Sequence, residues 1–204
     1  MAAFKNIILD LGGVLLDIDY KKTEQAFINL GFSNFSEMYS QYNADDLFTR
    51  LETGHISNEA FYEYMISKSP SSITREQVRD AWNAMLLTFR VETLAFLKGL
   101  GVEYKLYLLS NTNGIHLEAF AKILYSQTQE HSLDPYFKIA WYSHRIGLRK
   151  PNKDIFEFVL GDAGLQANET LFVDDSYNNI DTAKSLGLQT HLLKPRERLE
   201  DLPF

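Results

Sequence analysis

The sequence predicts an α/β fold, a Rossmann-like doubly wound parallel sheet into which an all-helical domain is inserted. Short apolar runs alternate with helical patterns from residue 90 onward, and this order is typical of a parallel sheet with crossover helices. Residues 17–89 show only helical patterns. We therefore expect residues 1–17 and 90–204 to form one α/β core, and residues 18–89 to form a helical insertion after the first strand.

Five apolar runs predict the strands of that sheet, at residues 6–9, 105–109, 139–142, 170–173 and 190–193. In the insertion, apolar residues recur at helical spacing in three stretches. One helix is expected to end before Gly31, and another is expected to begin at a Thr74-x-x-Gln77 capping box and to continue through Met85 and Leu86. Asp17 and Asp19 are expected at the start of the first inserted helix.

Composition narrows the classes of partner. The chain has 204 residues, 45% of them hydrophobic, and a formal net charge of −7. This acidic balance argues against nucleic acid and anionic membranes as partners. There is no cysteine, so disulfides and thiolate zinc sites are excluded, and the apolar run before Asp10 is too short to cross a membrane. The sequence therefore predicts a cytoplasmic protein without nucleic-acid or membrane partners.

Polar side chains follow the predicted strands at their carboxyl ends. In an open α/β sheet these ends share one edge, where ligands bind. Crowded carboxylates favour a cation with oxygen ligands such as Mg²⁺, and a lysine and a hydroxyl beside it suit an anion with several oxygens. This inventory fits phosphoryl transfer. The groups expected to meet are Asp10, Ser110, Asn111, Ser143, His144, Lys150, Asp174 and Asp175.

Four motifs in order carry a resemblance to a known family. They are DLGGVLLD at residues 10–17, LLSNT at 108–112, GLRKP at 147–151 and FVDDSYNN at 172–179. This set resembles the four motifs of the haloacid dehalogenase (HAD) superfamily. It is similar in particular to the phosphatases with a helical cap between the first two motifs, and among them to the α-D-glucose-1-phosphate phosphatase type.

The resemblance implies a catalytic set. Asp10 would be the nucleophile that forms an aspartyl-phosphate. Ser110 and the backbone N–H of Asn111 would bind phosphoryl oxygens, and Lys150 would neutralise both the phosphate and the nucleophile.

The resemblance also implies a Mg²⁺ site. Asp10, Asp175 and the backbone carbonyl of Gly12 would be the ligands. Asp174 and Asn179 would orient Lys150, Ser110 or metal-bound water from behind.

Gly12 departs from the family pattern, which has a second acid at this position. Glycine retains the carbonyl that binds the metal and lacks the carboxylate that protonates the leaving group. The loss of a general acid typically lowers the rate by roughly 10²–10⁴-fold. We therefore expect a leaving group that needs little protonation, such as an anomeric sugar oxygen, an acyl phosphate or a pyrophosphate, or a proton from a residue of the cap or from water.

The leading function is a Mg²⁺-dependent phosphatase for a small phosphorylated metabolite, with glucose 1-phosphate as the specific expectation. One alternative is a metal-independent 2-haloacid dehalogenase, which the intact pair Asp174 and Asp175 disfavours. Another is a catalytically impaired regulatory protein that binds phosphate and Mg²⁺.

Several structural alternatives also stay open. Asp10 alone would suit a turn, and Asp174, Asp175 or Ser176 would suit a helix cap. His55 is expected in an exposed turn, with a place in the site as the alternative. The oligomeric state, monomer or homodimer, is open. The aromatic residues of the insertion could line the site, pack internally or form a dimer contact; they include Tyr39, Tyr42 and Phe48.

Overall fold

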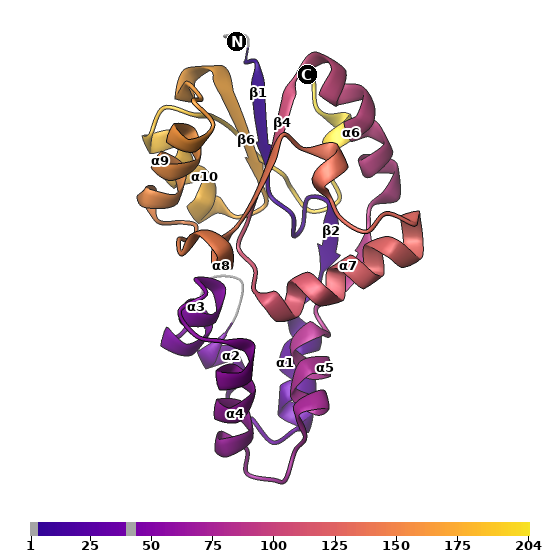
Figure 1. Cartoon of the computed structure of the whole chain (residues 1–204), viewed down its shortest axis with the longest axis vertical. Helices are drawn as coiled ribbons and strands as arrows, with labels where there is room; N and C mark the ends of the chain where they lie inside the picture. Colours follow the sequence, from indigo (N-terminus) through magenta and orange to yellow (C-terminus); the bar gives the residue numbers. More distant parts are fainter. Residues whose placement is uncertain (1–3, 40–43) are drawn as a thin grey trace.

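The computed structural model describes residues 4–39 and 44–204 and contains the predicted parallel sheet (Figure 1). Its strand order is β5-β4-β1-β6-β7, with the first strand of the chain in the centre. All five predicted apolar runs form strands of this sheet, which confirms the α/β fold class. The strands are β1 (Asn6–Leu9), β4 (Lys105–Ser110), β5 (Ile139–Tyr142), β6 (Thr170–Asp174) and β7 (Gln189–Leu192).

The register of the central strands brings their carboxyl ends to the same level. Leu9, the last residue of β1, is paired with Leu108 of β4 on one side and with Val173 of β6 on the other. The backbone N–H of Asp10 then donates to the carbonyl of Val173 at 2.9 Å. Asp10 is therefore fixed by the sheet beside Asp174, the residue that follows Val173.

Helices cover both faces of the sheet, so alternate residues of the central strand enter different hydrophobic clusters. Ile7 and Leu9 pack in a cluster with residues of α6 and α7. Ile8 packs in a second cluster with residues of α9 and α10. Figure 1 shows these two layers on opposite sides of β1. The core helices are α6 (Val91–Glu103), α7 (Gly114–Thr128), α8 (Ser143–Ile146), α9 (Lys153–Asp162) and α10 (Tyr177–Ser185), with 3₁₀ turns η1 (Asp134–Tyr136), η2 (Ala167–Glu169) and η3 (Leu199–Asp201).

The insertion forms a helical cap beyond the carboxyl edge of the sheet (Figure 1). Its core is aromatic: Phe48 and Phe61 surround the fully buried Trp82, and Phe27 stacks on Phe35 with ring centroids 4.2 Å apart. Phe48 thus packs internally, whereas Tyr42 lies outside the described residues. The cap helices are α1 (Tyr20–Asn29), α2 (Phe35–Met38), α3 (Asp46–Glu52), α4 (Asn58–Lys68) and α5 (Arg75–Asn83).

Two of the predicted helix starts in the cap are present. Thr74 and Gln77 form the reciprocal capping box at the start of α5. The carboxylate of Asp19 accepts from the backbone N–H of Lys21 at 3.0 Å and caps α1. Asp17 was also expected at the start of α1, and this is wrong: it lies in a strand, β2 (Leu16–Ile18), and its carboxylate pairs with Arg90 at 2.8 Å.

The predicted end of the last cap helix is also wrong, because Met85 and Leu86 lie beyond it. Helix α5 ends at Asn83, and Leu86 begins a strand, β3 (Leu86–Phe89), which pairs antiparallel with β2 (Leu16–Ile18). The apolar spacing that suggested a helix also suits a strand, and the pairing with β2 decides between them. The chain therefore crosses between core and cap through this small second sheet, and the limits 17/18 and 89/90 stay a prediction.

In the described part of the chain, no helix is both long enough and apolar enough to cross a lipid bilayer.

Candidate active site

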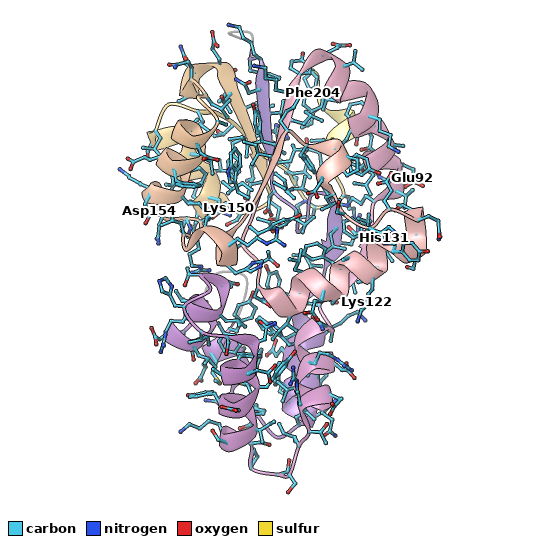
Figure 2. All side chains as sticks on the ribbon, viewed as in Figure 1. Glu92, Lys122, His131, Lys150, Asp154 and Phe204 are labelled. Carbon is cyan, nitrogen blue, oxygen red and sulfur yellow. The ribbon has the colours of Figure 1, made fainter. Side chains whose placement is uncertain are left out.

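Lys150 is the centre of a buried polar cluster at the carboxyl edge of the sheet, and Figure 2 labels it there. Only 1% of its side chain is exposed. Its Nζ donates to Asp10 Oδ1 at 2.6 Å, to Asp174 Oδ2 at 2.8 Å and to the carbonyl of Leu109 at 2.8 Å. An ammonium group has three hydrogens, so all three have an acceptor and the side chain is held in one position.

The backbone of Lys150 is held as firmly as its side chain. Asn111 Nδ2 donates to the carbonyl of Lys150 at 2.8 Å, and Asn111 Oδ1 accepts from the N–H of Lys150 at 2.9 Å. Asn111 directly follows β4, so this reciprocal pair ties the loop that carries Lys150 to the end of that strand. The amide side chain of Asn111 thus holds the backbone of Lys150, and the phosphoryl contact expected from the backbone N–H of Asn111 stays a prediction.

Asp174 is fully buried and saturated with hydrogen bonds. In addition to Lys150, it accepts from the backbone N–H of Ser176 at 2.8 Å and from Asn179 Nδ2 at 3.0 Å on both oxygens. Asp174 thus links β6, the start of α10 and the ammonium of Lys150. Ser176 is the N-cap residue of α10 and makes no side-chain capping bond, whereas Asp174 accepts from the backbone N–H of Ser176, just before the helix.

Burial dominates the protonation of this cluster. It raises the pKa of Asp10; Lys150 opposes the rise, while Asp174 and Asp175 add to it. Burial alone would lower the pKa of Lys150, but the carboxylates of Asp10 and Asp174 outweigh it and raise that pKa. Burial and the charge of Asp174 raise the pKa of Asp175 to about 6. Full ionisation of Asp10 and Asp175 is therefore unfavourable with Lys150 as the neighbouring cation of the cluster.

Carboxylate oxygens of Asp10, Asp174 and Asp175 lie within 4.8 Å of one another, a spacing that could hold a metal ion. The donors are hard oxygen atoms, which suit Mg²⁺ better than a soft metal. Three carboxylates against one lysine leave a surplus of two negative charges in this group of four side chains, which a divalent cation would balance. The donor set thus fits Mg²⁺.

Two glycines shape the floor of the site. Gly13 has φ +71°, and a Cβ there would collide with the carboxylate of Asp175. At Gly12 a Cβ would lie 2.5 Å from Ile18 Cδ1, so the side chain of Ile18 fills the space that a larger residue at position 12 would need. The absence of an acid at position 12 is therefore matched by an apolar neighbour, Ile18 of β2.

The pocket above this cluster has a volume of about 140 Å³ and lies between core and cap. Six of the eight predicted site residues line it: Asp10, Gly12, Asn111, Lys150, Asp175 and Asn179. Asp174 and Ser110 do not. Asp174 lies behind Lys150, and Ser110 is 2% exposed with its hydroxyl 3.4 Å from the carbonyl of Asn111. The chemical roles expected for these residues stay predictions.

Sequence reasoning missed Tyr20 and Glu52 of the cap and Arg149 of the core, which line the pocket. Tyr39 lines it too, which was one of the alternatives left open for the aromatic residues of the insertion. The sequence offered a reason to place Arg149 at the pocket, since it adjoins Lys150 in the third motif. It offered none for Glu52, because the partners of Glu52 are distant in the sequence. Burial raises the pKa of Glu52, and Arg149 opposes that rise.

Three other polar residues of the prediction lie outside the pocket lining. His55 is exposed and hydrogen-bonds Thr53 at 2.7 Å, as its assignment to an exposed turn predicts. The hydroxyl of Ser143 accepts from the N–H of Thr112 and donates to its carbonyl, both at 2.9 Å, so it holds the loop after β4. His144 lies in α8, against the cap.

Comparison with known proteins gives a consistent result. A curated relative, D-ribitol-5-phosphate phosphatase from Bacteroides thetaiotaomicron, is 34% identical over 186 residues, 91% of this chain and 90% of the relative. The HAD family enzyme BT-2542 from the same organism has been solved with magnesium and inorganic phosphate; it is 32% identical, with a TM-score of 0.86 and 98% of each chain covered.

A structure described as a predicted HAD-like family hydrolase from Porphyromonas gingivalis is 33% identical, with a TM-score of 0.85 over 96% of this chain and 93% of that one. The family profile for haloacid dehalogenase-like hydrolases matches residues 4–187. With this match over most of its length, the chain belongs to the haloacid dehalogenase-like hydrolase family.

Proposed function

We propose that this protein is a Mg²⁺-dependent phosphatase that hydrolyses a small phosphorylated sugar or polyol through an aspartyl-phosphate on Asp10. The observation that carries this proposal is the Asp10–Lys150–Asp174 cluster, with Asp175 beside it, at the floor of a small pocket. A cavity of about 140 Å³ restricts the occupant to a small molecule. The names of the ribitol-phosphate phosphatase and of the magnesium and phosphate complex support the same class.

In the first step a carboxylate oxygen of Asp10 attacks phosphorus. Since Oδ1 accepts from Lys150, we assign Oδ2 as the attacking atom. The new P–O bond forms as the bond to the leaving oxygen breaks, and that oxygen takes the bonding electrons and then a proton from water. Water then attacks the aspartyl-phosphate, which releases phosphate and restores Asp10. Lys150 neutralises the nucleophile and the phosphoryl oxygens throughout, from a position that Asp174 fixes.

Asp10, Asp175 and the carbonyl of Gly12 are the residues that would hold Mg²⁺. The bound cation supplies charge neutralisation to the phosphoryl oxygens. Asp174 is the least suited of the three aspartates to ligate it, because Lys150, Ser176 and Asn179 already occupy its oxygens. We therefore assign Asp174 to the positioning of Lys150.

Gly12 bears on the choice of substrate. Position 12 has no carboxylate to protonate the leaving oxygen, and Ile18 occupies the space where such a side chain would begin. Two substrates distinguish the possible consequences of Gly12 for the leaving group. Glucose 1-phosphate has an anomeric leaving oxygen that needs little protonation, whereas D-ribitol 5-phosphate, suggested by the curated relative, has a primary alkoxide that needs a proton.

The test is phosphate release from glucose 1-phosphate, glucose 6-phosphate and D-ribitol 5-phosphate, with Mg²⁺ and with a chelator. We expect Mg²⁺-dependent turnover that Asp10→Asn reduces to background. Asp17→Asn, a matched change at a carboxylate that pairs with Arg90 outside the pocket, is expected to keep most of the activity. Preference for glucose 1-phosphate would support the leaving-group account of Gly12, and preference for ribitol 5-phosphate would require another proton donor.

The two alternatives have their own outcomes in this test. Binding of Mg²⁺ and phosphate by calorimetry without any turnover would identify a regulatory binding protein. Chloride release from 2-chloropropionate without Mg²⁺ would identify a dehalogenase, which the acidic pair Asp174 and Asp175 disfavours.

A further inference from the structure

Glu52 and Arg149 form an ion pair across the pocket, one from the cap and one from the core. Arg149 Nη2 lies 2.8 Å from Glu52 Oε2, and the side chains are 22% and 6% exposed, respectively. The hydroxyl of Tyr39 donates to Glu52 Oε1 at 3.1 Å. All three residues line the pocket that contains Asp10. The mechanism proposed above assigns no role to these three side chains.

This pair has unused hydrogen-bonding capacity. Among the described residues, Glu52 Oε2 accepts no hydrogen bond of good geometry and Arg149 Nε–H donates none, although both atoms are buried. Leaving a buried donor and acceptor without partners costs free energy. A hydroxyl group supplies both partners at once, because it can donate to the carboxylate and accept from the guanidinium.

The charges of the pair indicate what kind of group it would bind. Glu52 would repel a phosphate, and Arg149 would repel an ammonium, whereas the neutral pair favours a neutral polar group. Lys150 and the expected cation already neutralise phosphate at the floor of the pocket. The Glu52–Arg149 pair therefore suits the uncharged part of a substrate.

The backbone keeps Glu52 in place opposite Arg149. Glu52 ends α3, which packs against α8 of the core, as Figure 1 shows. Gly54, two residues later, has φ +69°, and a Cβ there would collide with the carbonyl of His144. The absence of a side chain at Gly54 thus lets the end of α3 lie against α8, which leads into the loop that carries Arg149.

We propose that Glu52 and Arg149 bind a hydroxyl group on the organic part of the substrate and so select sugar and polyol phosphates over phosphates of plain alkyl chains. This inference rests on the proposed phosphatase function. Tyr39 is a positioning residue in it, since it holds the second oxygen of Glu52.

The experiment compares kcat/KM for D-ribitol 5-phosphate and n-pentyl phosphate, which has the same number of carbons and no hydroxyls. If the wild type prefers glucose 1-phosphate, cyclohexyl phosphate is its matched partner. We expect the ratio of hydroxylated to plain substrate to fall at least about tenfold in Glu52→Gln, because a hydrogen bond to a charged group is lost. Arg149→Lys, which keeps the charge and removes Nε–H, is expected to lower the ratio in the same direction.

Glu130→Gln is the control. Glu130 is a partly buried carboxylate that pairs with Lys98 at 3.1 Å and does not line the pocket. Its ratio of kcat/KM values should match that of the wild type. An equal loss on both substrates in Glu52→Gln and Arg149→Lys would show a structural role only and overturn the inference. Equal kcat/KM values of the wild type for pentyl phosphate and ribitol 5-phosphate, and equal values for cyclohexyl phosphate and glucose 1-phosphate, would also overturn the inference. The proposed phosphatase function would stand in that case. A wild type without turnover of any phosphate would overturn both.

Discussion

At the scale of single residues, several buried polar groups of this protein have their partners in distant parts of the chain. His116 of α7 is an example outside the polar cluster around Lys150. Its Nε2 lies 3.1 Å from the carbonyl of Trp82 in the cap, and its ring stacks on the indole at a centroid distance of 4.6 Å. Burial lowers the pKa of His116 to about 4, partly offset by the hydrogen bond to Trp82. A neutral imidazole is therefore part of the contact between core and cap.

This burial predicts a pH-dependent stability. Between pH 6.5 and about 4 the unfolded chain binds a proton at His116 and the folded chain does not, so the free energy of unfolding decreases as the pH falls. The full effect corresponds to about 3 kcal/mol. Urea denaturation across this range should give a shallower pH slope in His116→Gln than in the wild type. The same substitution at the exposed His131, labelled on the outer surface in Figure 2, is the control and should leave the pH slope unchanged. An unchanged slope in His116→Gln would contradict the assignment of this pH dependence to His116.

The residues of the polar cluster around Lys150 were predictable to the extent that they follow the ends of strands. Asp10, Asp174 and Asp175 follow apolar runs, and parallel topology brings strand ends together whatever the sequence between them. Glu52 was not predictable in this way, because it ends a helix of the cap and its partner Arg149 is brought to it only by the docking of cap on core. For Ser110 the sequence indicated the position in a motif, but it did not indicate that the side chain would be buried.

At the scale of helices and strands, local signals were accurate where they involve the backbone directly. The capping box at α5 is formed by two hydrogen bonds between residues three positions apart, so the sequence contains all of it. Strand β3 depends on β2, which lies about seventy residues earlier in the chain. A short apolar stretch without its partner fits either structure, and Leu86 was therefore assigned to a helix.

The capping box predicts a measurable contribution to stability. Thr74→Ala removes the acceptor for the N–H of Gln77 and should lower the free energy of unfolding by about 1 kcal/mol. Asn152 stands at the N-cap of α9 without a side-chain capping bond, so Asn152→Ala is the matched control and should change stability by less than about 0.5 kcal/mol. Chemical denaturation of both variants gives the comparison, and equal effects would mean that the box contributes nothing beyond residue preference.

At the scale of the whole molecule, the sequence predicted two parts but not how they meet. The contact of Gly54 with His144 and the ion pair of Glu52 with Arg149 close the pocket from the cap side. Neither contact follows from hydrophobic periodicity, because both depend on the orientation of the cap. The fold class could thus be predicted from patterning, whereas the upper wall of the site could not.

Gly54 offers a test of that contact. In Gly54→Ala the new methyl group meets the carbonyl of His144, so the cap should shift from the core and kcat/KM should fall by about tenfold. Gly164 has a similar φ of +62° with no atom near its Cβ position, so Gly164→Ala reports the backbone cost of about 1 kcal/mol alone. Steady-state kinetics on both variants separates the two effects, and equal activities would show that the contact does not matter for turnover.

The pairing of β2 with β3 also means that the cap leaves and rejoins the core at adjacent points, with Leu16 opposite Phe89. A stretch of chain whose two ends lie together can be exchanged as one piece without pulling the rest of the protein apart. Asp10, Lys150, Asp174 and Asp175 all lie outside it. A chimera that carries a foreign cap on this core would therefore keep the proposed phosphatase site, and we expect its substrate preference to follow the donor of the cap.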